Sequence, residues 1–107
     1  MLSLETYEMK PKIDPLVEKV IEELSPAVRY IRYEVKPDWN GDPAVLFRVV
    51  LSDKATRTKA SRRDVTRRVK DQIMERIFLP DLGVFPHFDF RSESEQAKRK
   101  DPDWDGR

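Results

Sequence analysis

The chain has 107 residues, the length of one ordinary domain, which leaves no room for a second. Its 21 Lys and Arg nearly cancel its 20 Asp and Glu, so the formal net charge of +1 excludes a binder that works through bulk positive charge. It contains no cysteine and no apolar run as long as the ~18 residues that cross a bilayer, which excludes disulfides, thiolate chemistry and membrane contact and favours a cytoplasmic protein.

The first predicted helix follows a polar N-terminal segment. Residues 1–12 show no sustained hydrophobic period, and we expect a tail there. Asp14 and Pro15 predict a helix start, because an Asp carboxylate caps free backbone N–H groups and proline is tolerated in the first turn. Apolar residues then recur at helical spacing up to Leu24, and Ser25-Pro26 ends the run.

Two strands come next. From Val28 to Lys36 the pattern has a period of two, with apolar residues on one face and charged residues on the other. Asn40-Gly41 supplies the positive φ angles that a hairpin needs. A second strand is predicted over Ala44–Ser52, with Val45, Phe47, Val49 and Leu51 on its buried face.

A long helix and a third strand complete the predicted domain. Val65, Val69, Ile73 and Ile77 recur every four residues and predict a helix that ends near Leu79-Pro80. Residues 84–91 alternate as a third strand, and its proline indicates an edge position. We expect residues 92–107 to be a polar, flexible tail, so the domain itself covers residues 13–91.

The order of these elements, α-β-β-α-β, predicts the α+β class and a two-layer sandwich. A right-handed crossover through the long helix makes the second and third strands parallel. Inserting the first strand between them gives an antiparallel sheet in the order 2-1-3, with both helices on one face. This topology resembles RNA-binding KH-type domains, but the chain has no Gly-x-x-Gly loop with which KH domains clamp phosphates.

The sheet face without helices is the first candidate site. The alternation along the three predicted strands places six residues of interest on this face: Arg32, Leu46, Arg48, Val50, Phe85 and His87. Because Leu46 and Val50 are apolar neighbours, we expect this face and the edge of the second strand to bind a protein, either a second copy or another chain. Trp39 in the hairpin is a further candidate anchor. The alternative is a solvated face with ion pairs such as Glu34 with Arg48.

The long helix is the second candidate site. It carries the basic residues Arg62, Arg63, Arg67 and Lys70. A cationic strip of this kind suits phosphates, so the alternative function is a small KH-like or sheet-based module that binds RNA or DNA. Ordinary surface pairs, such as Asp64 with Arg68 at i,i+4, explain the same charges without a ligand.

Two near-repeated pentapeptides set a tryptophan on a tight turn. They are Pro37-Asp38-Trp39-Asn40-Gly41 and Pro102-Asp103-Trp104-Asp105-Gly106. The two tryptophans are either exposed anchors or simply parts of turns, with Trp39 as a lid on the core. Asp101, Asp103, Asp105 and Gly106 match only the opening of a calcium loop, because its later ligands are missing.

No catalytic motif is present. His87 is the only histidine, and the His-x-Asp pair it forms with Asp89 has no apparent nucleophile or third metal ligand nearby. We therefore expect no enzyme, no cofactor and no metal site.

The hairpin and the second strand also carry a family resemblance. Residues 38–44, Asp-Trp-Asn-Gly-Asp-Pro-Ala, and residues 47–53, Phe-Arg-Val-Val-Leu-Ser-Asp, are similar to segments of small prokaryotic α-β-β-α-β proteins encoded beside HEPN-type toxin-like partners. Residues 90–95, Phe-Arg-Ser-Glu-Ser-Glu, extend the similarity. The resemblance implies an antitoxin-like or accessory role.

Overall fold

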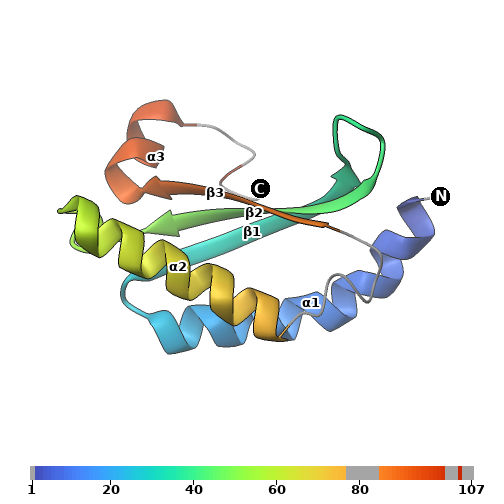
Figure 1. The fold of residues 1–107 in the computed structure, drawn as a ribbon, viewed down its shortest axis with the longest axis horizontal. Coiled ribbons are helices and arrows are strands. Elements are labelled where there is room, and N and C mark those ends of the chain that lie inside the picture. Colours follow the sequence, from blue (N-terminus) through green and yellow to red (C-terminus); the bar gives the residue numbers. More distant parts are fainter. Residues whose placement is uncertain (1, 77–84, 101–103, 105–107) are drawn as a thin grey trace.

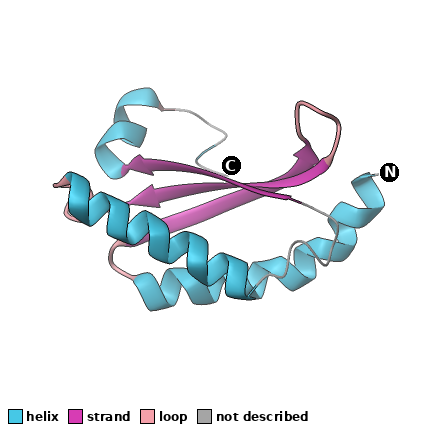
Figure 2. Cartoon of the chain, viewed as in Figure 1, coloured by secondary structure: helices cyan, strands magenta, loops and turns pink. Residues whose placement is uncertain are grey.

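The computed structural model describes residues 2–76, 85–100 and 104, with the order and the α+β class that the sequence predicts and one additional short helix (Figures 1 and 2). The elements are α1 (Leu2–Leu24), β1 (Val28–Pro37), β2 (Pro43–Leu51), α2 (Lys59–Arg76), β3 (Phe85–Ser92) and α3 (Glu93–Arg99). The expected end of the second helix near Leu79 lies outside the described residues. No helix in the described ranges combines the length and the apolar character that a bilayer crossing requires.

The sheet order is β1-β2-β3, so the predicted 2-1-3 order was wrong. β1 and β2 pair antiparallel through the hairpin, and β2 and β3 pair parallel, which makes the sheet mixed rather than antiparallel. The parallel orientation of the second and third strands was correctly predicted. Because β2 is central, it offers no free edge to a partner, and the edges belong to β1 and β3. A central strand is covered on both faces and is therefore more uniformly apolar than an edge strand. The outward residues of β2 fit this position, because they include the apolar Ala44, Leu46 and Val50.

The first helix begins at Leu2, so residues 2–12, where we expected a tail, are helical. Pro11 and Pro15 lie inside α1. An interior proline removes one helical hydrogen bond and bends the axis without forbidding a helix, which is why Asp14-Pro15 does not mark the start. The Asp14 carboxylate instead accepts a hydrogen bond from the Tyr33 hydroxyl of β1. This bond and burial together raise the pKa of Tyr33 above its ordinary value.

The main core lies between the sheet and the two long helices, as the alternating patterns predict. Phe47 at the centre of β2 is fully buried, and its ring stacks on Phe88 of β3 at a centroid distance of 5.4 Å. The other buried members of this core are Ile13, Val17, Val20, Val28, Ile31, Val45, Val49, Leu51, Val65, Val69 and Ile73. Figure 1 shows α1 and α2 on this side of the sheet and α3 on the opposite side.

Part of the segment over which we expected a flexible tail, residues 92–107, is helical, since Glu93–Arg99 form α3. Ser92 caps α3: its hydroxyl accepts the Glu95 N–H at 3.1 Å, and the Ser92 N–H donates to the Glu95 carboxylate at 3.0 Å. The sequence Ser-x-x-Glu carries this capping box. The Arg62 guanidinium of α2 bonds the same carboxylate at 2.8 Å, and Ser94 donates its hydroxyl to Asp53 at 2.7 Å. Local capping and long-range polar bonds therefore fix this segment against the domain.

We predict that the Glu95 contacts stabilise the fold in a pH-dependent way. The hydrogen bond from Arg62 and, next, that from the Ser92 N–H hold the pKa of Glu95 below its ordinary value of 4.5. A carboxyl group whose pKa is lower in the folded state stabilises above its unfolded pKa, and this contribution is lost as the pH falls through the folded pKa. Glu95→Gln should therefore cost about 1 kcal/mol at neutral pH, because Glu95 is partly exposed and solvent screens the pair.

Urea denaturation of the wild type and Glu95→Gln between neutral pH and the acid range measures this difference. The two stability curves should converge as the pH drops below the ordinary carboxyl range. Glu22→Gln, at an exposed position of α1, is the control and should follow the wild type throughout. A constant difference between Glu95→Gln and the wild type at every pH would contradict the assignment.

Candidate interaction surfaces

The outer face of the sheet is divided into a covered half and an open half. The C-terminal segment, of which the structure describes α3 and Trp104, lies over the end of the sheet near Val50 and Ser92. Trp104 is only 2% exposed, and the Arg91 guanidinium lies 4.2 Å from the centroid of its ring. Arg91 also donates to the Gln96 side chain at 2.9 Å. Val50, predicted to bind a partner on an open face, is 1% exposed beneath this segment, so the chain itself occupies its contact surface.

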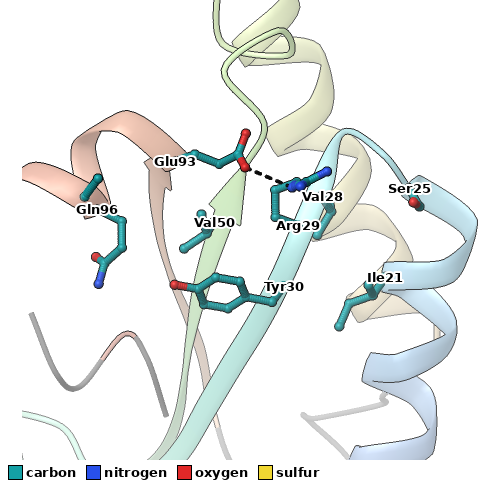
Figure 3. A pocket seen from close by; sticks show the side chains of 9 residues that line it. Ile21, Ser25, Val28, Arg29, Tyr30, Val50, Glu93 and Gln96 are labelled. Atoms are coloured by element: carbon teal, nitrogen blue, oxygen red, sulfur yellow. Dashed lines mark ion pairs between the residues drawn. The ribbon is translucent and has the colours of Figure 1, made fainter. Parts of the chain in front are cut away.

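A cavity of about 520 Å³ remains between the covering segment, β1 and the end of α1 (Figure 3). Arg29 of β1 and Glu93 of α3 form an ion pair of 3.0 Å beside it. In Figure 3 the Tyr30 ring and Val50 lie between this pair and Gln96. The ion pair joins the N-terminal end of β1 to α3, and the cavity is therefore part of the packing between the segment and the sheet.

The open half surrounds the hairpin. Trp39 is 90% exposed at its tip, and Phe85 at the start of β3 is 56% exposed. The turn that holds Trp39 is closed by its own hydrogen bonds: the Asp38 carboxylate accepts the N–H groups of Asn40 and Asp42 at 2.9 and 3.0 Å, and Gly41 adopts a φ of +85°. Trp39 is thus a large apolar side chain held in solvent by its own turn, and it does not cover the core.

A hollow of about 410 Å³ lies beside Trp39 on this open half. It is lined by Lys36, Pro37, Asp38, Trp39, Ala44, Leu46 and His87. Phe85 stands next to it, because Phe85 is the register partner of Ala44 in the parallel pair. Four predicted partner-binding residues, Trp39, Leu46, Phe85 and His87, are therefore gathered on one side of the sheet. We name this surface the Trp39 face.

The predicted arginines of the outer face are largely engaged within the chain. Arg48 donates to Glu34 at 2.7 Å, as the solvated-face alternative predicted, and its side chain is only 12% exposed. This bond lowers the pKa of Glu34. The Arg32 guanidinium lies 4.9 Å from the centroid of the Tyr30 ring. These two residues form the boundary between the two halves and do not line the hollow beside Trp39.

A third hollow, of about 460 Å³, runs between α2 and the edge strand β3. It is lined by Lys59, Arg62, Arg63, Thr66, Lys70, Phe88, Asp89 and Phe90. Three of the four predicted basic residues, Arg62, Arg63 and Lys70, meet here. Arg67 lies outside this lining and pairs with Asp64 at 3.2 Å. Sequence reasoning missed Lys59, although it stands four residues before Arg63 and so shares its helix face.

The His-x-Asp pair and the carboxylates of the described residues were the candidates for metal ligands. No three carboxylate or histidine side chains gather in the described part of the chain in a way that holds a metal ion. His87 lines the hollow beside Trp39, whereas Asp89 lines the hollow beside α2. The incomplete calcium motif at Asp101, Asp103 and Asp105 lies outside the described residues.

Comparison of the chain with models of known protein families, with curated proteins and with solved structures gives no significant match.

Proposed function

We propose that this chain is a non-catalytic interaction protein that forms a homodimer through the Trp39 face. The observation that carries the proposal is the exposure of Trp39 and Phe85, at 90% and 56%, beside an unfilled hollow. Aromatic side chains have few rotatable bonds and bury a large apolar area on binding, and such residues dominate the energetics of protein interfaces.

A second copy of the chain fits this surface because the protruding Trp39 side chain and the hollow that could accept it lie side by side. Under a two-fold axis each copy offers the same patch, so Trp39 of one chain enters the hollow of the other and the reverse contact forms at the same time. Leu46 and Ala44 give the hollow an apolar floor, and Lys36 and His87 give it a polar rim. An apolar centre with a polar rim is the usual anatomy of a protein interface.

The same surface includes Asp38, Trp39 and Ala44, which belong to the first segment that carries the resemblance to proteins encoded beside HEPN-type partners. Residues 38–53 contain the whole hairpin turn and all of β2. An accessory or antitoxin-like role of the dimer is therefore part of this proposal. The covered half of the sheet takes no part, because the C-terminal segment already fills it.

The test is the oligomeric state of the purified chain. Sedimentation equilibrium from about 1 to about 300 µM should show a monomer–dimer equilibrium, since specific contacts of this kind commonly have micromolar dissociation constants. The double variant Trp39→Ser/Phe85→Ser should raise the dissociation constant by about 100-fold or more, because each aromatic anchor contributes more than about 1 kcal/mol.

Met74→Ser is the matched control. Met74 is also an exposed apolar residue, at 37%, but it lies on α2 and away from the Trp39 face. Its replacement should leave the dissociation constant unchanged within about twofold. A wild-type chain that sediments as a monomer throughout the range would overturn the proposal, and so would an equal effect of the control variant.

A further inference from the structure

A second surface, independent of the Trp39 face, lies between α2 and β3. Lys59, Arg63 and Lys70 stand at positions i, i+4 and i+11 of α2, so their side chains share one face of the helix. All three line the hollow of about 460 Å³ that separates α2 from the edge strand. Sequence position and groove geometry therefore gather these charges on one wall.

These three cations are not committed to internal ion pairs. Among the residues that the structure describes, no carboxylate lies within ion-pair distance of Lys59, Arg63 or Lys70. The other basic residues of α2 differ: Arg67 and Arg68 both pair with Asp64, each at 3.2 Å. Arg62 is neutralised by Glu95 at 2.8 Å. Asp89 is the one acidic residue in the lining of the groove.

The opposite wall of the groove is aromatic. The rings of Phe88 and Phe90 stack with centroids 6.2 Å apart and an angle of 11° between their planes. Lys70 reaches across the groove, and its Nζ lies 5.7 Å from the centroid of the Phe90 ring. A cationic wall thus faces an aromatic wall, with a positive charge already placed over one ring.

We propose that this groove binds a single-stranded nucleic acid. Lys59, Arg63 and Lys70 neutralise phosphates along the strand, and the half-buried Phe88 and Phe90 contact the bases from the lining of the groove. Proteins that bind single strands combine a positive groove that follows the backbone with aromatic side chains beneath the bases. An acidic peptide would pair with the cations but has no bases to contact the aromatic rings. A nucleic-acid duplex keeps its bases paired and stacked inside the helix, where the rings of the groove cannot reach them.

Fluorescence anisotropy with a labelled oligo(dT) of about 12 nucleotides tests this proposal, a length within the site sizes of single-strand binders. The groove variant Arg63→Gln/Lys70→Gln should weaken binding at least tenfold at low salt. It should also lower the slope of log affinity against log salt by roughly 1.4, since each phosphate contact on a single strand contributes about 0.7.

The matched control is Arg67→Gln/Arg68→Gln, which removes the same charge from the same helix outside the groove. It should weaken binding less than about threefold, because only the screened long-range field changes. Equal losses in the two double variants would show attraction to net charge alone and would overturn the proposal. Absence of binding by the wild type at ~0.05 M salt would also overturn it.

A variant that is expected to strengthen binding separates an effect on the groove from a loss of folding. Asp89→Asn removes the acidic group of the groove and should strengthen binding about threefold, while thermal melts monitored by circular dichroism confirm that each variant is folded. Poly-glutamate and an oligonucleotide duplex serve as competitors. If either competitor displaces the labelled strand as effectively as unlabelled oligo(dT) does, the groove binds another class of ligand and the proposal is overturned.

Discussion

Trp104→Ala is expected to destabilise the protein by about 3 kcal/mol, the size of effect that follows removal of a buried tryptophan. Trp104 is 2% exposed, and its ring lies against the Arg91 guanidinium. The substitution removes this ring from its contact with Arg91, the register partner of Val50 in the sheet. For a domain of this size the midpoint of thermal denaturation should fall by more than about 10 °C.

The first pentapeptide, which holds Trp39, supplies the control. Trp39→Ala changes the same residue type in nearly the same local sequence, but at a side chain that is 90% exposed. It should change the free energy of unfolding of the monomer by less than about 0.5 kcal/mol. Urea denaturation at a protein concentration that keeps the chain monomeric measures both values. Similar effects of the two substitutions would contradict the contrast in burial.

Val50→Asp is expected to be at least as damaging, with a loss of about 3 to 5 kcal/mol. Val50 is 1% exposed, and the cavity beside it is lined mainly by β1 and α3. An aspartate there must lose most of its hydration or take up a proton, and both are costly. A large fraction of the variant should be unfolded at 25 °C, because domains of this size are stable by only about 5 to 15 kcal/mol.

Leu46→Asp is the matched comparison on the same strand and the same face. Leu46 is half-buried at the hollow beside Trp39, so an aspartate there stays hydrated. It should cost less than about 1.5 kcal/mol, while it removes the apolar floor of the proposed dimer contact. Circular dichroism and urea denaturation distinguish the two variants. A folded, stable Val50→Asp variant would show that the C-terminal segment does not cover this position.

Much of the fold follows from local patterns. Alternation over β1 and β2, the four-residue recurrence of Val65, Val69 and Ile73, and the Asn40-Gly41 turn are each local signals, and each matches the structure. The Ser-x-x-Glu signature at Ser92 is equally local and predicts the start of α3. The polar composition of residues 92–107 favoured a flexible tail with at most a helical turn through residues 95–98, but polarity by itself does not exclude order.

The strand order required more than connectivity. Both orders keep the hairpin between the first two strands, and both keep the second and third strands parallel. What separates them is the outward face of β2, where Leu46 and Val50 are apolar while β1 presents Arg32 and Glu34. We interpreted that apolar face as a binding surface, although it is also the mark of a central strand.

For the candidate site residues, the sequence identified the types of side chain but not which of them remain accessible to a partner. It identified Trp39, Leu46, Phe85 and His87, which share one surface, and Arg63 and Lys70, which share another. It also identified Val50, Arg48 and Arg67, whose contact surface or charge the chain satisfies internally.

The sequence by itself thus determined the order of the main helices and strands and which face of each is apolar, because these depend on neighbours a few positions away. Only the tertiary structure decided which of the two tryptophans is buried and, among the described residues, which charges remain unpaired. The reason is physical: burial and ion pairing depend on groups such as Arg91 with Trp104 or Arg62 with Glu95, whose approach requires the folded sheet. A repeated sequence of five residues does not specify which distant residues will pack against it in the folded protein.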